Sequence, residues 1–84
     1  MARFVYFAWV RERIGAAQEE IALPPEVRTV ADLPAFLARR SDGHASAMEQ
    51  SDVIRFALDQ EAAEPSDAIG DAREIAVFPP MTGG

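Results

Sequence analysis

The chain has 84 residues, a formal net charge of −6 at pH 7 and 49% hydrophobic residues. This length supports one domain with a single core and leaves little room for an internal active site. With no cysteine and one histidine, a disulfide framework, a thiolate nucleophile and a histidine metal cluster are excluded. Negative charge without a basic cluster argues against nucleic-acid binding. The N-terminal apolar run breaks at Arg11 and has no basic leader, so we expect a cytoplasmic protein without a membrane span.

The first third of the chain predicts a β-hairpin. Residues 3–10 are rich in aromatic and β-branched types and predict a strand that is apolar on both faces. A turn over residues 11–15 and a second strand over residues 18–23 would complete the hairpin, which Pro24 and Pro25 end.

Apolar residues at helical spacing then predict an amphipathic helix from about residue 29 to 41. Thr29 and Asp32 are both candidate N-caps. A cap at Thr29 leaves Pro34 unable to donate the hydrogen bond to the Val30 carbonyl, whereas a cap at Asp32 places Pro34 in the tolerated first turn. Both starts remain open at this point.

The second half of the chain is expected to supply the remaining strands. Gly43 is expected to terminate this helix, and residues 44–50 could add a short helical turn. The lone His44 is expected to be an exposed loop residue. Asp59-Gln60 is predicted to form a tight turn between two of the strands. The predicted strands cover residues 53–58, 61–63 and 74–78, and the last stops at Pro79.

This element order predicts an α+β domain of the β-grasp type, a mixed sheet with one main crossing helix and adjacent first and last strands. If that helix covers the even-numbered face of the first strand, then Val5, Phe7, Trp9 and Phe78 form an apolar patch on the open face. Such patches usually mark partner surfaces. The alternative is that residues 44–50 cover this face.

The C-terminal residues provide a candidate reactive group. We expect a domain over residues 1–78 and a flexible tail over residues 79–84. Pro79-Pro80 cannot extend the strand, and the tail could reach ~20 Å at full extension. Gly83-Gly84 fits a narrow channel and leaves the Gly84 carboxylate as its reactive group.

The run Phe78–Gly84, together with Phe7–Glu12 and Gly15, resembles the MoaD-like branch of the ubiquitin-like sulfur carriers, the small subunits of molybdopterin synthase. The resemblance spans the chain in length and element order, although residues 24–52 match in pattern alone. Two turns depart from the family. Asp59 replaces the usual asparagine, and Ala72-Arg73-Glu74 replaces a Gly-Asp-Glu turn, which must therefore be built differently.

The resemblance implies a sulfur-donor subunit that is not an enzyme alone and binds no cofactor. An E1-like adenylating enzyme would consume ATP to activate Gly84, and a sulfur donor would then form a C-terminal thiocarboxylate. The large synthase subunit, in a complex with two copies of each chain, would use that sulfur to build the molybdopterin dithiolene from a cyclic pterin phosphate. Besides Gly83 and Gly84, the candidate partner-binding residues are Phe7, Trp9, Arg11, Phe78, Pro79, Pro80, Met81 and Thr82.

The sequence also allows other interpretations of these residues and of the function. Trp9 could equally serve ordinary sheet packing, and Arg11 could be a solvated arginine. The pairs Glu19-Glu20 and Glu61/Glu64 are expected to be solvated and not catalytic. The protein could also carry sulfur for another pathway such as thiamine thiazole synthesis, act as a ubiquitin-like protein modifier, or be an adaptor with an inert tail.

Overall fold

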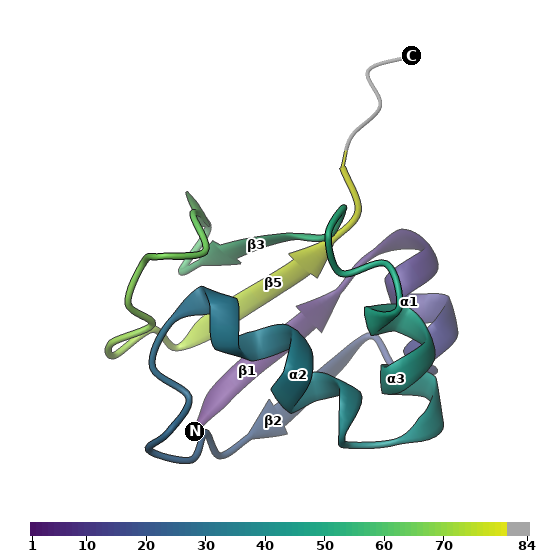
Figure 1. Cartoon of the computed structure of the whole chain (residues 1–84), viewed down its shortest axis with the longest axis horizontal. Coiled ribbons are helices and arrows are strands. Elements are labelled where there is room, and N and C mark those ends of the chain that lie inside the picture. Colours follow the sequence, from purple (N-terminus) through teal and green to yellow (C-terminus); the bar gives the residue numbers. More distant parts are fainter. Residues whose placement is uncertain (81–84) are drawn as a thin grey trace.

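The computed structural model describes residues 1–80, which form a five-stranded mixed sheet (Figure 1). The strands are β1 (Ala2–Tyr6), β2 (Gln18–Ile21), β3 (Arg55–Leu58), β4 (Glu61–Ala63) and β5 (Glu74–Phe78). Their order is β2-β1-β5-β3-β4, and the central pair β1 and β5 is parallel while the other pairs are antiparallel. The predicted β-grasp arrangement, with the first and last strands side by side, is confirmed.

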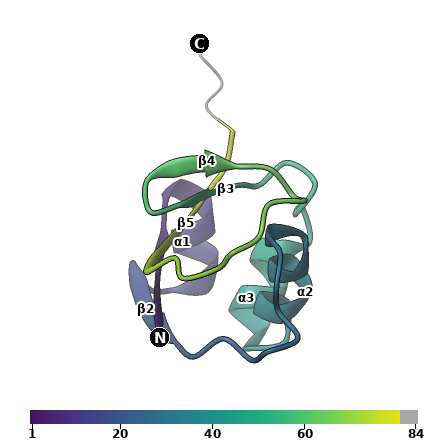
Figure 2. The same cartoon turned by 90° about the vertical axis from the view of Figure 1, so that its left-hand side faces the viewer.

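The helices lie over one face of this sheet. They are α1 (Ala8–Ile14), a 3-10 turn η1 (Val30–Asp32), α2 (Leu33–Ala38) and α3 (Asp42–Met48). In Figure 2, α2 and α3 stand on one side of the sheet and the opposite face is uncovered. The core between them contains Phe4 and Tyr6 from β1 and Ile75 and Val77 from β5, all nearly inaccessible to solvent. The even-numbered face of β1 is therefore the covered face, which is the condition under which the sequence predicts an apolar patch on the open face.

The strand expected over residues 3–10 is wrong in its second half. β1 ends at Tyr6, and Ala8 adopts a left-handed backbone (φ 53°) that turns the chain into α1. A helix is favoured over a continued strand because it buries Val10 completely in the core. Gly15 ends this helix with a left-handed C-cap at φ 88°. Consequently Trp9 lies on α1 and not on the open sheet face.

The two candidate starts of the second helix are both used. Thr29 caps η1, and its backbone N–H donates to the Asp32 carboxylate at 3.0 Å. Asp32 then occupies the N-cap of α2, which places Pro34 in the first turn, where proline is tolerated. One expected helix is thus divided into a 3-10 turn and a short α-helix.

The prediction that Gly43 terminates a helix is wrong, because Gly43 lies inside α3. A Cβ at this position would stand 2.6 Å from the backbone oxygen of Arg13, so glycine permits α1 and α3 to approach closely. The alternative that residues 44–50 cover the open sheet face is also wrong, because α3 packs against α1 and α2.

The tight turn at Asp59-Gln60 is confirmed, with both residues at positive φ. The Asp59 carboxylate accepts hydrogen bonds from the backbone N–H groups of Arg73 and Glu74, at 2.9 and 3.0 Å. In the neighbouring turn the left-handed residue is Gly70 (φ 56°) and not Ala72. That turn is therefore built differently, as the departure from the family pattern predicts.

Candidate functional site

The candidate site lies at the end of the sheet where β5 leads into Pro79-Pro80 (Figure 1). Phe78 and Pro79 are half-buried, and Pro80 is exposed. Here the chain leaves the domain next to the β1–α1 junction, because the Phe7 N–H donates to the Val77 carbonyl at 3.1 Å. The predicted site residues Met81, Thr82, Gly83 and Gly84 lie outside the described residues.

An aromatic pair stands on the open sheet face at this end. The rings of Phe7 and Phe78 meet edge to face with centroids 6.5 Å apart. Phe7 is 47% exposed although it is a large apolar residue. Half-buried Val5 belongs to the same face of β1. Three of the four residues of the predicted patch are thus on one surface, which we name the Phe7–Phe78 surface, and Trp9 is the exception.

Beside this surface is a cavity of about 520 Å³ between Phe78 and the β3–β4 hairpin. Its lining combines apolar side chains with Arg55 and Glu64; the apolar residues include Ile54, Phe56, Ala63, Pro65 and Phe78. Arg55 is exposed and stands opposite Phe78 in the β3–β5 register. Sequence reasoning missed Arg55, although strand pairing with Phe78 was the signal that could have found it.

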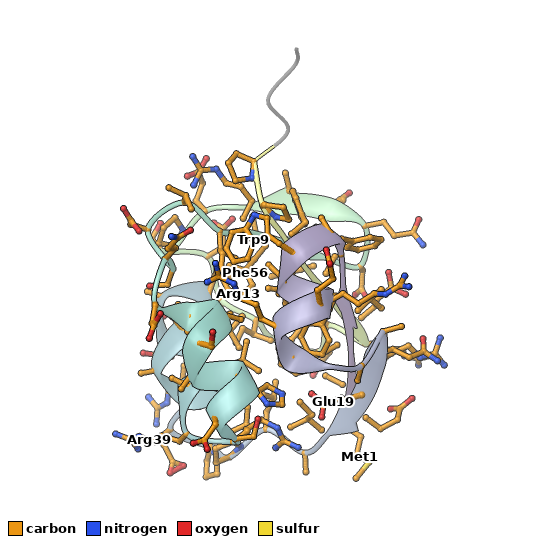
Figure 3. The ribbon with its side chains drawn as sticks, turned by 90° about the vertical axis from the view of Figure 1, so that its right-hand side faces the viewer. Met1, Trp9, Arg13, Glu19, Arg39 and Phe56 are labelled. Carbon is orange, nitrogen blue, oxygen red and sulfur yellow. The ribbon has the colours of Figure 1, made fainter. Side chains whose placement is uncertain are left out.

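Trp9 and Arg11 both project from α1. Trp9 is half-buried, and the guanidinium carbon of Arg13 lies 4.7 Å from the centre of its ring (Figure 3). Arg11 is exposed and forms no ion pair within residues 1–80. The structure therefore places Arg11 where a partner can reach it, whereas the indole of Trp9 is held on the side of the molecule that faces α3.

The prediction that His44 is an exposed loop residue is wrong. His44 lies on α3 and is buried, with 5% exposure. Its Nε2 lies 2.7 Å from the Glu19 carboxylate, and its Nδ1 lies 2.7 Å from the Ser41 hydroxyl. The Tyr6 hydroxyl donates to the same Glu19 oxygen, also at 2.7 Å. Glu19 is thus mostly buried and not solvated, because its side chain points inward from β2 toward α3. Glu20, Glu61 and Glu64 are exposed, as predicted.

The electrostatics of this cluster indicate a structural role. Burial raises the pKa of Tyr6 above its ordinary range, and the hydrogen bond to Glu19 adds to this effect. Burial alone would raise the pKa of Glu19 as well, but hydrogen bonds from Tyr6 and His44 outweigh it and lower that pKa. Glu19 lies well away from Pro79-Pro80 (Figure 3). The cluster therefore connects β2 to α3 and is not part of the candidate site.

The described part of the chain has, at its Pro79-Pro80 end, features that are typical of a binding surface and not of a catalytic centre. No three histidine, cysteine, aspartate or glutamate side chains gather there as metal ligands. None of its helices is long and apolar enough to cross a membrane. Within residues 1–80, this end of the sheet carries the Phe7–Phe78 surface, the adjoining cavity and the segment Pro79-Pro80 that follows β5. These features define a small β-grasp protein with an apolar surface beside that segment.

The chain belongs to the ThiS family, whose model matches residues 4–84. Two curated relatives match over their full length and that of this chain. The molybdopterin synthase sulfur carrier subunit of Escherichia coli K12 is 34% identical, and the protein of the same name from Haemophilus influenzae Rd is 33% identical. Among solved structures, small archaeal modifier protein 1 of Haloferax volcanii superposes with a TM-score of 0.70 and 25% identity, covering 95% of this chain and 97% of that one.

Proposed function

We infer that this chain is the sulfur carrier subunit of a molybdopterin synthase. The observation that carries this inference is the full-length match to two sulfur carrier subunits of that enzyme, within the ThiS family. The fold supports it, because β5 directs the C-terminal segment out of the domain beside an exposed apolar surface. A carrier needs these two features, a reactive end and a surface by which a partner holds the domain.

The partner of a synthase small subunit is the large subunit. We propose that the Phe7–Phe78 surface, with Trp9 and Arg11 on α1, contacts the large subunit while the segment from Pro79 to Thr82 enters its active site. Exposed aromatic side chains at the centre of an interface contribute much of its binding energy, which favours Phe7 as an anchor. The assembly is proposed to contain two copies of each subunit.

The proposed chemistry takes place at the carboxylate of Gly84. An E1-like adenylating enzyme binds the tail, and the carboxylate oxygen attacks the α-phosphate of ATP to give an acyl-adenylate and pyrophosphate. Sulfide-level sulfur from a donor attacks the acyl carbon and displaces AMP, and this step forms the thiocarboxylate. The large subunit then transfers this sulfur to a cyclic pterin phosphate, and an oxygen from water replaces it at Gly84 to restore the carboxylate. The carrier itself binds no cofactor in this scheme, and catalytic groups belong to the large subunit. Consumption of ATP favours a cytoplasmic location.

Intact-protein mass spectrometry tests this function. The chain is incubated with ATP, the adenylating enzyme of its host and a sulfur donor, beside a variant that lacks Gly84. We expect a mass gain that corresponds to replacement of one oxygen by sulfur in the full chain alone. Confirmed adenylation without this gain would overturn the sulfur-carrier function.

A second candidate function is that of a ubiquitin-like protein modifier, favoured by the structural similarity to small archaeal modifier protein 1. Activation is the same up to the acyl-adenylate, and the acceptor is then a lysine amine on a target protein. Covalent adducts of this chain in extracts of its host would support that function. Transfer of sulfur to a thiazole precursor instead of the pterin would assign the carrier to thiamine synthesis, and full function after deletion of Gly83-Gly84 would indicate an inert tail.

A further inference from the structure

We propose that Arg13 is a positioning residue that fixes the indole of Trp9 as a second anchor for the large subunit, separate from the Phe7–Phe78 surface. This inference rests on the proposed function. It begins with the left-handed backbone of Ala8, which divides two neighbouring aromatic residues between two sides of the molecule. Phe7 stays on the open sheet face beside Phe78, whereas Trp9 lies in the first turn of α1 and faces the side on which α3 lies (Figure 3).

Arg13 follows Trp9 by four residues on α1, so the two side chains share one face of the helix. The guanidinium carbon lies 4.7 Å from the indole centre, within the range of a cation–π contact. The Nη1 atom of Arg13 also donates to the backbone carbonyl of Ser46 on α3, at 3.1 Å. The guanidinium group of Arg13 therefore contacts both the Trp9 ring and the backbone of α3, and this second contact keeps the planar group, and with it the indole, in one orientation.

The location of Trp9 makes this orientation relevant to docking. α1 begins directly beside the end of β5, since the Phe7 N–H bonds to the Val77 carbonyl. Trp9 thus stands at the same end of the molecule as Pro79-Pro80, as Figure 3 shows. A large subunit that takes up the segment after Phe78 must cover this end, with the Phe7–Phe78 surface on one side of the segment and Trp9 on the other.

Preorganisation explains why an arginine is useful here. Trp9 packs against the hydrophobic core but is only half-buried, so Arg13 restrains the part of the indole that the core does not cover. Fixing the ring in advance removes part of the entropic cost of forming the interface. Tryptophan is also among the residues that most often dominate binding energy at interfaces.

Binding to the purified large subunit, measured by calorimetry, tests the proposal with three variants of the full chain. Arg13→Met keeps an unbranched side chain but removes the charge and the planar group, Arg13→Lys restores the charge, and Arg39→Met is the control. Arg39 is exposed at the end of α2, far from Pro79-Pro80. We expect Arg13→Met to weaken binding about three- to tenfold, Arg13→Lys to recover part of the loss, and Arg39→Met to have no effect.

Two further measurements distinguish positioning of the Trp9 indole from a purely structural role in which Arg13 only connects α1 to α3. Trp9 is the single tryptophan of the chain, so its fluorescence reports on this site alone. We expect a red shift and stronger quenching by acrylamide in Arg13→Met. In a Trp9→Leu background the same substitution should no longer weaken binding, because the ring it positions is gone.

The outcomes distinguish failure of the positioning role of Arg13 from failure of the proposed function. An equal loss of affinity from Arg13→Met with Trp9 or Leu at position 9 would overturn the positioning role, and so would unchanged affinity or unchanged fluorescence. Failure of the unsubstituted chain to bind the large subunit would overturn the proposed function and, with it, this inference.

Discussion

A single glutamate shows how this small domain holds polar groups in its interior. Glu19 accepts hydrogen bonds from Tyr6 and His44, both 2.7 Å away, and Arg40 lies 4.0 Å from its second oxygen. Among the described residues no buried side-chain nitrogen or oxygen lacks a hydrogen-bond partner. The cluster therefore avoids the cost of an unpaired polar group and links α3 to the sheet.

Glu19→Gln is expected to lower stability by about 1–3 kcal/mol at pH 7, because charged hydrogen bonds are lost. The pKa of Glu19 is lowered from its ordinary value of 4.5 in the fold. Its stabilising contribution is therefore complete above pH 4.5 and disappears as the pH falls through the lower folded value. Urea unfolding at a series of pH values should show the difference between wild type and variant narrowing below pH 4.5.

Glu20→Gln is the matched control, because the neighbouring Glu20 is exposed and, within residues 1–80, its one ion pair is with exposed Arg3. We expect it to change stability by less than about 0.5 kcal/mol at any pH. Parallel pH curves for Glu19→Gln and wild type would contradict the account of the buried cluster.

At the scale of elements, the turn at Asp59 joins two parts of the sheet. Asp59→Ala removes the acceptor for the Arg73 and Glu74 N–H groups and leaves alanine at φ 48°. We expect a loss of about 1–3 kcal/mol. Asp59→Asn keeps an oxygen acceptor and tolerates this backbone, so its stability should stay within about 0.5 kcal/mol of wild type in urea unfolding. Equal losses in both variants would contradict the role of the side-chain oxygen.

The close contact between α1 and α3 makes a second prediction at this scale. Gly43→Ala places a Cβ 2.6 Å from one backbone oxygen, of Arg13, and 3.3 Å from another, of Ile14. The helices must separate, and we expect thermal unfolding to show a loss of about 1–3 kcal/mol.

Gly70→Ala is the control for Gly43→Ala, because a Cβ there meets nothing within 4 Å and only its positive φ opposes the change. Its cost should be about 1–2 kcal/mol. Greater stability of Gly43→Ala than wild type, as helix propensity alone would give, would contradict the close contact.

These elements also show which parts of the fold the sequence could predict. The sheet was predictable because strands with β-branched and aromatic residues end at prolines and tight turns. α1 was not, because Phe7, Trp9 and Val10 are types common in strands, and the helix depends on distant burial of Val10 and on the backbone of Ala8. Local propensity was overridden by tertiary packing.

The candidate site divides in the same way. Strand parity was enough to bring Phe7 and Phe78 together, since alternation fixes which residues share a face. The contact between Trp9 and Arg13 required α1 and was therefore missed. His44 could have been placed on a helix, because Ser41 and Asp42 form an N-terminal signal before the buried residues His44, Ala47 and Met48.

At the scale of the whole molecule, one end is specialised for contact. Phe7→Ala is expected to weaken binding to the large subunit at least about tenfold, because it removes an exposed aromatic anchor. Stability should fall by no more than about 1 kcal/mol, since the side chain is half-exposed. Calorimetric titration and thermal unfolding measure the two effects separately.

Glu26→Ala is the control for Phe7→Ala. Glu26 is exposed in the loop after β2, at the opposite end of the sheet. Affinity should remain at the wild-type value. Unchanged affinity of Phe7→Ala, or an equal loss in Glu26→Ala, would contradict docking through the Phe7–Phe78 surface.

The position of β5 has a consequence for biosynthesis. This strand is made last but occupies the middle of the sheet, where it connects the β2-β1 pair to the β3-β4 pair. Among the described residues, no strand pairing joins the β2-β1 pair to the β3-β4 pair until β5 is in place. In the proposed function, an adenylating enzyme that contacts both the sheet surface and the segment after Phe78 therefore finds the two together only on chains that contain β5. Incomplete translation products would escape activation without any separate proofreading step.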